Sequence, residues 1–428
     1  MAQTLRLGIA GLGTVGVGVV KILRQKSNLL QKRTGKSLEV AAVCARDRSK
    51  DRGISLKDYA WETDAISLAQ REDIDIFIEL IGGHRGPALE ATKAALSKGK
   101  DVVTANKAML AHFGHELALQ AEEKGALIRF EAAVAGGIPV IKSLTEGLAG
   151  NEVSRVMGVM NGTCNYILTQ MQATGRDYKA LFEECAELGY LEADPTLDVG
   201  GIDAGHKLSL ISSIAFGTQV DFNAVSLEGI ERVALEDIEQ ANDMGFRIKL
   251  LGVTQMTEKG LEQRMSPCLV PKYSPLGQLD GGTNMMVLEG DEVGQIVLRG
   301  PGAGEGPTAS AVLSDVVEIA RGTRLSTFGQ PAVTLEKAIP ASAVTPAPYY
   351  IRLRLKDKPG ALAKIATVLG QEGVSIDRMR QYGHSDEAAP VIIVTHKTAR
   401  KALDTALINL PQTGVLEGIP VAIRIEDV

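Results

Sequence analysis

An aspartate and a lysine four residues apart are the strongest candidates for chemistry in this 428-residue chain. Asp203 and Lys207 fall in the run GIDAGHKLSLI, which is predicted to be helical, so both side chains lie on one helix face. Apolar residues on the neighbouring faces place the pair near a buried boundary. A lysine there can transfer a proton to or from a substrate oxygen. The spacing alone leaves open a surface ion pair worth about 0.3–0.5 kcal/mol.

A second lysine follows a strand-like run of the first part of the chain. Lys107 comes directly after VVTAN (102–106). Ligands of open α/β sheets bind at the carboxyl ends of strands. We therefore expect Lys107 to lie beside a substrate or a nicotinamide, with a plain surface position as the alternative.

The segment FEAAVAGGIPV (130–140) offers oxygen atoms for a cation. We expect it to be extended, so that carbonyl groups two residues apart point the same way. Val134, Gly136 and Ile138 would then present three aligned carbonyl oxygens, and Glu131 would add a carboxylate. Oxygen ligands suit a hard cation, although every extended strand presents such rows of carbonyls.

Three glycines form the pattern G-x-G-x-x-G near the N-terminus. Gly11, Gly13 and Gly16 lie between the apolar run LRLGIA (5–10) and a predicted helix at 17–30. The first glycine allows a tight turn, the second lets the backbone approach a pyrophosphate, and the third lets helix and strand pack closely. The free N–H groups of the helix start would then meet the phosphates. The order predicts a dinucleotide site, the alternative being a cluster of turn glycines.

The residues after the second predicted strand bear on the choice of dinucleotide. Arg46 comes first after LEVAAVCA (38–45), followed by Asp47 and Arg48. Guanidinium groups suit the 2′-phosphate of NADP, whereas a carboxylate suits the ribose 2′-hydroxyl of NAD. We expect NADP, and Asp47 leaves NAD open. The alternative for both arginines is a solvated loop.

Alternating strands and helices must position these groups, which predicts a parallel sheet in the first 130 residues. Strands are expected at 5–10, 38–45, 73–83 and 101–105, with helices at 17–30, 62–72 and 87–97. Helices are next expected near 164–174, 177–188, 202–216 and 308–322, the last after a glycine loop at 300–306. Residues 331–348, rich in Pro and Ala, are interpreted as a linker. The last eighty or so residues follow the βαββαβ order of ferredoxin-like folds.

Composition excludes several classes of protein. The net charge is −6 and aromatic residues make up 4% of the chain, so we expect neither nucleic acid nor a membrane surface as partner. No apolar run approaches 20 residues and the N-terminus lacks the pattern of a signal peptide. The four cysteines form no C-x-x-C pair, which indicates reduced thiols and a cytoplasmic protein.

Seven motifs in one order give the chain a resemblance to a known family. It resembles homoserine dehydrogenase, in the bacterial form with a C-terminal ACT domain, in GLGTVG, VVTANKAML, FEAAVAGGIPV, NGTCNYIL, GYLEADPTLDVGGIDAGHKLSLI, PGAGEGPTASAVLSD and KDKPGALAKIA. The resemblance implies an α/β protein with a Rossmann nucleotide-binding domain, an α+β catalytic and dimerisation domain and a ferredoxin-like ACT domain. The implied boundaries are 1–130 with 308–330 for the first domain, 131–307 for the second, 331–348 for the linker and 349–428 for the third.

The same resemblance implies an activity and its residues. The family interconverts L-homoserine and L-aspartate 4-semialdehyde with NAD(P), in the biosynthesis of threonine, methionine and isoleucine. Lys207 would be the proton donor and acceptor, with Glu192, Asp203 and Lys107 at the substrate. The implied cofactor contacts are Gly11, Gly13, Thr14, Val15, Gly16, Arg46, Lys107, Gly189 and Gly304. Glu131, Val134, Gly136 and Ile138 match the family's sodium site.

The resemblance also implies regulation and assembly. L-Threonine would act as a feedback inhibitor at the ACT turn Asp357-Lys358-Pro359-Gly360, and ACT domains commonly pair, which implies a dimer or tetramer. A purely structural dimerisation role for this domain is the alternative. Two other functions compete with the main one: a semialdehyde dehydrogenase with Cys164 as nucleophile, and a sensor of NAD(P) and amino acids without catalysis.

Overall fold

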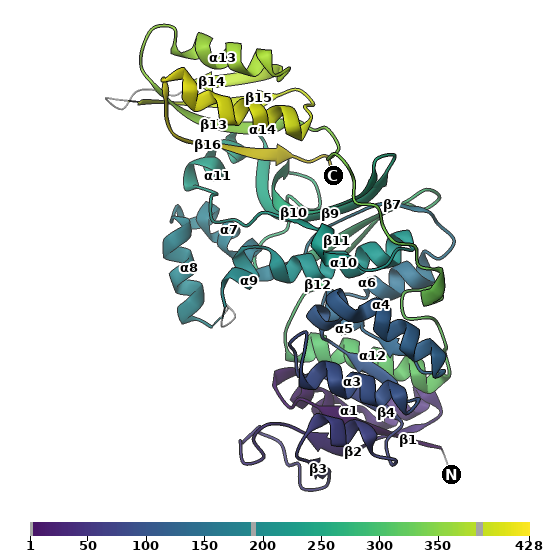
Figure 1. Ribbon diagram of the computed structural model, residues 1–428. Coiled ribbons are helices and arrows are strands. Elements are labelled where there is room, and N and C mark those ends of the chain that lie inside the picture. Colours follow the sequence, from purple (N-terminus) through teal and green to yellow (C-terminus); the bar gives the residue numbers. More distant parts are fainter. Residues whose placement is uncertain (1–2, 190–193, 382–387) are drawn as a thin grey trace.

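A computed structural model describes residues 3–189, 194–381 and 388–428 of the chain (Figure 1). Figure 1 shows three parts stacked along one direction: an N-terminal sheet with its helices, a middle part, and a C-terminal unit at the far end. Residues of the first and third parts are therefore distant from each other, and the middle part contacts both.

The N-terminal sheet has six parallel strands in the order β3-β2-β1-β4-β5-β6. Its strands are β1 (Thr4–Ala10), β2 (Ser37–Cys44), β3 (Ala60–Glu62), β4 (Ile76–Glu79), β5 (Asp101–Thr104) and β6 (Ile128–Arg129), and its helices α1 (Thr14–Thr34), α2 (Ala65–Gln70), α3 (Pro87–Ser97) and α4 (Lys107–Glu123). The prediction of a parallel sheet is confirmed. The strand expected at 73–83 is shorter and covers only Ile76–Glu79; Gly82 and Gly83 beyond it have positive φ and are not part of an extended strand.

A helix from far along the sequence completes this part. Helix α12 (Glu305–Arg321) packs against α1, and its Ala309, Val312 and Val316 share a buried core with Val19. A Cβ atom on Gly18 would lie 2.8 Å from the Glu305 side chain, so the two helices approach too closely for any larger residue. The return of a helix to this domain agrees with the one expected at 308–322.

The middle part is built on antiparallel strands, apart from one two-residue strand that pairs in parallel, with helices against one face. Its strands are β7 (Val153–Val159), β8 (Ser226–Leu227), β9 (Phe246–Thr257), β10 (Gly260–Pro271), β11 (Thr283–Gly290) and β12 (Gly294–Pro301), and its main helices α7 (Gly162–Thr174), α8 (Tyr178–Glu187), α9 (Thr196–Val199), α10 (Ile202–Phe216) and α11 (Leu235–Asp243). Helix α10 begins and ends at glycines with positive φ, Gly201 and Gly217. It lies against the sheet and carries the predicted Asp203 and Lys207.

The C-terminal unit has the predicted order β13 (Tyr349–Lys356), α13 (Ala361–Gln371), β14 (Ile376–Gln381), β15 (Ala388–Thr395), α14 (Arg400–Asn409) and β16 (Leu416–Ile425). Its sheet is not separate, because β16 pairs in parallel with β10 through Cys268–Arg424 and Leu269–Ile425. The middle and C-terminal sheets therefore form one continuous sheet. The segment 331–348 that joins the parts packs along the middle part, with Glu336 bridged to Thr218 and Pro340 to Leu261.

One sequence expectation about backbone shape is wrong. The segment 130–140 is not extended: it forms the short helices α5 (Glu131–Val134) and α6 (Val140–Lys142) around a turn at Gly136 with φ +56°. The Glu131 carboxylate accepts hydrogen bonds from the N–H groups of Ile141 and Lys142, both at 2.9 Å. These contacts fold the segment back on itself, so the row of aligned carbonyls does not form.

The four cysteines are buried thiols. Over the described ranges, no helix combines the length and the apolar character that crossing a bilayer requires.

Candidate active site

The glycine turn borders a cavity of about 710 Å³ in the N-terminal sheet. A Cβ atom on Gly11 would lie 2.3 Å from the Leu80 carbonyl oxygen, and one on Gly16 would lie 2.0 Å from that of Gly11. Gly13 has open space around its Cβ position. The first and third glycines are therefore required by packing, while the second leaves room for a ligand at the start of α1, as the pattern predicts.

Three cationic side chains line this cavity. They are Arg46, Lys50 and Arg52, and the carboxylates of Asp47 and Asp64 line it with them. Arg52 is fixed by donating to the carbonyl oxygens of Leu12 at 3.1 Å and Lys50 at 2.8 Å. The sequence pattern does not identify Lys50 and Arg52 as cavity residues, because only the fold of their loop brings them beside the glycine turn.

Asp47 is engaged within its own loop. Its Oδ1 accepts from the N–H group of Ser49 at 2.8 Å and from the Ser49 hydroxyl at 2.6 Å. The hydroxyl bond is the main reason that the pKa of this exposed carboxyl lies below its usual value. The Arg48 guanidinium lies 5.8 Å over the Trp61 ring instead of lining the cavity. Of the two arginines predicted to face a 2′-phosphate, the structure places Arg46 at the cavity and Arg48 beside it.

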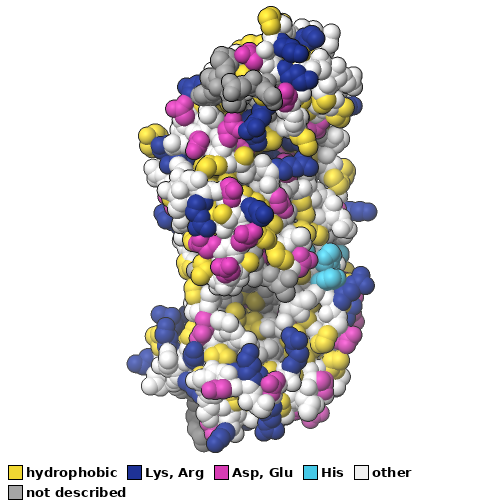
Figure 2. Space-filling model, turned by 90° about the vertical axis from the view of Figure 1, so that its left-hand side faces the viewer, with side chains coloured by type: hydrophobic (Ala, Val, Ile, Leu, Met, Phe, Trp, Pro, Cys, Tyr) yellow, Lys and Arg dark blue, Asp and Glu magenta, His cyan; other side chains and the backbone are white. Residues whose placement is uncertain are grey.

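A second cavity, of about 630 Å³, lies where the N-terminal sheet meets the middle part. Figure 2 shows a hollow in the surface at this junction. Val15 of the glycine turn lines the cavity, so the two cavities lie on either side of that turn. Its polar lining includes Lys107, Asn161, Thr163, Tyr166, Asp198, Asp203, Lys207, Asn284 and Thr308.

One carboxylate joins the two predicted lysines inside this cavity. Asp203 Oδ1 lies 2.7 Å from Lys107 Nζ, and its Oδ2 lies 2.8 Å from Lys207 Nζ. Lys207 Nζ also donates to the Met160 carbonyl oxygen at 2.9 Å. Asp203 is 8% exposed and Lys207 9%, so the alternative of a surface ion pair is wrong.

The charge state of this carboxylate follows from its neighbours. Burial alone would raise the pKa of Asp203, but the Lys207 and Lys107 ammonium groups hold that pKa well below its usual range. The two ammonium groups thus favour the anionic form of Asp203, which pairs with both lysines. An oriented ammonium group at a cavity wall can give a proton to a substrate oxygen or receive one through its conjugate base.

Lys107 is positioned by the end of the N-terminal sheet. It is the first residue of α4, whose cap residue Asn106 accepts from the Met109 N–H group and donates to the Gly83 carbonyl oxygen at 2.7 Å. Buried Glu79 accepts from the Thr104 hydroxyl at 2.5 Å and from the Ile81 N–H group at 2.7 Å. These bonds tie the carboxyl ends of β4 and β5 together. Ligands of open α/β sheets bind at this edge of the sheet.

Several polar residues in the cavity were not singled out from the sequence, among them Asn161 and Asn284. Asn161 caps α7 and donates to Asp198 Oδ1 at 3.2 Å. Asn284 donates to the Met160 carbonyl oxygen at 3.1 Å, and its buried Oδ1 has no hydrogen-bond partner among the described residues. The Asn-Gly start of NGTCNYIL was a visible signal for Asn161, whereas Asn284 comes from β11 and only the fold brings it here.

Other predicted residues lie outside this arrangement. Glu192 falls outside the described residues. Gly189 follows α8 and lines neither of these two cavities. Gly304 caps α12 with φ +119°, next to the cavity residues Gly302 and Ala303. Thr14 is the first residue of α1.

The predicted cation ligands are divided between two environments. Val134 and Gly136 line the second cavity. The Glu131 carboxylate is committed to α6, and the Ile138 carbonyl oxygen accepts from the Val140 N–H group at 2.9 Å. Burial, followed by the negative charge of Asp315, raises the pKa of Glu131 to about 7.

Comparison with known proteins agrees with this architecture. A family model described as homoserine dehydrogenase matches residues 139–317, the model of its NAD-binding domain matches residues 11–131, and an ACT-domain model matches residues 349–411. The chain is 41% identical to a homoserine dehydrogenase of Neisseria gonorrhoeae and 36% identical to one of Bacillus subtilis, with 99% of each chain covered.

Solved structures lead to the same family. The fold matches a homoserine dehydrogenase from Thiobacillus denitrificans with a TM-score of 0.94 at 38% identity, covering 99% of both chains. A hyperthermophilic archaeal homoserine dehydrogenase, solved in complex with NADPH, matches with a TM-score of 0.63 at 26% identity, over 74% of this chain and 97% of that one. The chain therefore belongs to the homoserine dehydrogenase family of NAD(P)-dependent oxidoreductases.

Proposed function

We propose that this enzyme interconverts L-homoserine and L-aspartate 4-semialdehyde, in the biosynthesis of threonine, methionine and isoleucine. The observation that carries the proposal is the Asp203 carboxylate held between Lys107 and Lys207 in the cavity beside the glycine turn. A bound nicotinamide supplies or accepts the hydride. The aldehyde oxygen gains negative charge as it is reduced, and Lys207 donates a proton to it; in oxidation Lys207 takes the hydroxyl proton.

The other polar groups have matching roles. Asp203 orients Lys207, and together with Glu192 it attracts the α-ammonium group of the substrate. Lys107 contacts the substrate or the cofactor from the N-terminal sheet. Burial raises the pKa of the Cys164 thiol well above its usual value, which argues against the alternative of a semialdehyde dehydrogenase with a cysteine nucleophile.

Removing the Lys207 ammonium group tests the reaction. We expect Lys207→Met to lower kcat by about 10²–10⁴-fold, the range of a lost proton donor, while the dissociation constant of the cofactor, measured by NADPH fluorescence, changes little. Lys249→Met is the matched control, because Lys249 is also a buried lysine but lines neither of these two cavities. A near-normal kcat in Lys207→Met, or an equal loss in the control, would contradict the assignment.

We propose further that NADP is the preferred cofactor. Arg46, Lys50 and Arg52 bring three cationic groups to the cavity, and the Asp64 carboxylate there is engaged by Ser67. The Asp47 carboxylate, which would favour NAD, is engaged by Ser49. A 2′-phosphate therefore has charge-assisted donors available.

Cofactor preference is measured as the ratio of kcat/KM for NADP to kcat/KM for NAD. We expect Arg46→Ala to lower this ratio about tenfold, which corresponds to about 1.4 kcal/mol. Arg48→Ala is the control and leaves the ratio within about twofold, because that side chain does not line the cavity. An unchanged ratio in Arg46→Ala would remove the basis for the NADP assignment.

We propose a sodium ion at Glu131, Val134, Gly136 and Ile138, where it would hold the junction of the two domains and take no part as a Lewis acid. The support is the match to the family's sodium site and its set of oxygen donors, of which Val134 and Gly136 line the cavity wall.

Sodium binding to the folded state alone raises stability. We expect the wild-type enzyme to have a higher Tm in sodium chloride than in choline chloride of equal ionic strength. The difference should be smaller in Glu131→Gln. Equal Tm values in the two salts would show that no sodium site exists.

We propose that L-threonine inhibits the enzyme through the ACT turn between β13 and α13. Gly360 has φ +84° there, with open space around its Cβ position, so a ligand can approach the backbone. The alternative is a structural role in assembly.

We also propose a cytoplasmic homodimer or tetramer, for which the exposed Ile408 and Ile419 of the ACT domain offer apolar contact area. Sedimentation equilibrium distinguishes such an oligomer from a monomer.

A single-residue variant tests the turn better than deletion of the domain. Removing residues 345–428 would strip β16 from β10 and leave buried Arg264 without its Glu426 partner. We expect Gly360→Ala to raise the threonine concentration for half-inhibition at least tenfold without changing the uninhibited kcat. Gly373→Ala is the control, since Gly373 is another open glycine of positive φ in the same domain. Unchanged inhibition in Gly360→Ala, or none in the wild type, favours the structural role.

A further inference from the structure

A third cavity, of about 360 Å³, lies between the middle part and the ACT domain. Arg264 of β10 and Glu228, which follows β8, line it from the middle part. Tyr349, Arg400 and Arg424 line it from the ACT domain. The cavity therefore exists only because the two parts are docked, and its lining differs entirely from that of the active site.

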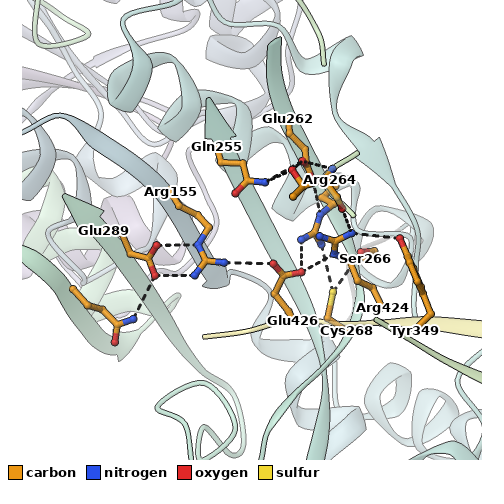
Figure 3. Close-up of polar contacts among 12 residues, drawn as sticks. Arg155, Gln255, Glu262, Arg264, Ser266, Cys268, Glu289, Tyr349, Arg424 and Glu426 are labelled. Atoms are coloured by element: carbon orange, nitrogen blue, oxygen red, sulfur yellow. Dashed lines mark hydrogen bonds and ion pairs between the residues drawn. The ribbon is translucent and has the colours of Figure 1, made fainter. Parts of the chain in front are cut away.

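Two of its arginines are buried and rigidly held (Figure 3). Arg264 is 4% exposed and Arg424 6%. Glu426 joins them: its Oε2 lies 2.5 Å from Arg264 Nη2 and 2.7 Å from Arg424 Nε. Arg264 also binds Glu262 at 3.0 Å. The two carboxylates neutralise the two guanidinium groups and hold them in fixed orientations. This wall of the cavity therefore carries no excess charge.

One of these guanidinium groups, that of Arg424, can still donate a hydrogen bond into the cavity. Arg424 Nη1 donates to the Thr345 carbonyl oxygen at 2.7 Å and to the Tyr349 hydroxyl at 3.3 Å. Its Nη2 makes no hydrogen bond to any residue that the structure describes. This nitrogen is not one of the fully buried unpartnered atoms of the described residues, so a ligand or solvent in the cavity can reach it. A carboxylate is the ligand that such a nitrogen binds best.

A carboxylate also lines the cavity without a hydrogen-bond partner. The backbone N–H group of Glu228 donates to the Met265 carbonyl oxygen at 2.8 Å, but the Glu228 side chain makes no hydrogen bond within the described ranges. Arg400, the third arginine, is paired at 2.8 Å with Asp404, which also lines the cavity, and it feels the charge of Glu228. A small cavity with guanidinium donors and a separate carboxylate matches a molecule that carries both charges.

We propose that this cavity binds a small zwitterionic amino acid, with its carboxylate at Arg424 and Arg400 and its ammonium group at Glu228. Phosphate fits less well, because it would bring two negative charges beside Glu228 with the arginines already neutralised. The site is distinct from the ACT turn: Tyr349 begins β13 and Gly360 lies beyond its end, and eight residues at about 3.3 Å each separate them by more than about 20 Å.

The packing links this cavity to the catalytic helix. Ser226 and Leu227 of β8 pair with Arg264 and Met265 of β10. Met265 packs on Gly201 at the start of α10, and Leu227 packs on Gly205 within it. A ligand that binds Glu228 and the arginines therefore acts next to Leu227 and Met265. Both residues contact α10, the helix that carries Asp203 and Lys207. This regulatory role rests on the proposed catalytic function, whereas binding to the cavity does not.

Calorimetric titration of the full-length enzyme tests the site. The probes are L-threonine, the other L-amino acids in turn, inorganic phosphate, and 3-hydroxybutyrate, which lacks the ammonium group. We expect an L-amino acid to bind, with its affinity lowered at least tenfold in both Glu228→Gln and Arg400→Gln. Glu228→Gln should leave binding of 3-hydroxybutyrate unchanged. Lys401→Gln is the matched control, because Lys401 is the exposed neighbour of Arg400 on α14.

The outcomes separate this site from the other proposals. Amino-acid affinity that is lost in Gly360→Ala but kept in Glu228→Gln and Arg400→Gln would place the ligand at the ACT turn and overturn the cavity site. Tighter binding of phosphate than of every amino acid, or no amino-acid binding at millimolar concentration, would also overturn it. The uninhibited kcat with homoserine should stay unchanged in all these variants, so failure of the catalytic proposal is seen separately.

Discussion

The Asp203 carboxylate, shared between two lysines, is the constraint on which the arrangement of the active site depends. Lys107 comes from the end of the N-terminal sheet and Lys207 from α10 of the middle part, so this one side chain joins two domains at the cavity. Removing one partner of a buried charged group leaves the others uncompensated and is costly. The three residues therefore require each other, and the alignment of the two domains is coupled to the alignment of the reacting groups.

The rest of the fold fixes the two ends of that contact. On one side, Glu79 and Asn106 tie the ends of β4 and β5 to the start of α4. On the other, Gly201 starts α10 in a left-handed conformation against Met265 of β10. Strand β10 also pairs with β16 of the ACT domain. The catalytic helix and the ACT domain thus both contact β10. A change in the ACT domain can reach the catalytic helix through this one strand.

The sequence predicts features that depend on local order, and it misses those that depend on distant contacts. The glycine turn was predictable because a strand, three glycines and a helix are consecutive, and the shared face of Asp203 and Lys207 followed from helical spacing. Their burial did not, since it comes from other elements of the fold. Lys50, Arg52 and Asn284 reach the cavities only through loop and sheet geometry. The prediction that the segment 130–140 is extended was wrong, because the local sequence does not show that Glu131 bonds to residues of α6 and α12. The joined sheets illustrate the same limit, because two residue pairs connect β10 to β16.

The contact between Asp203 and Lys107 couples the two domains at the active site, and a double-mutant cycle measures this coupling. It compares kcat/KM for homoserine in Asp203→Asn, Lys107→Met and the double variant. We expect the double variant to lose at least tenfold less than the product of the single losses, because each change disrupts the same contact. Losses that multiply independently would contradict it.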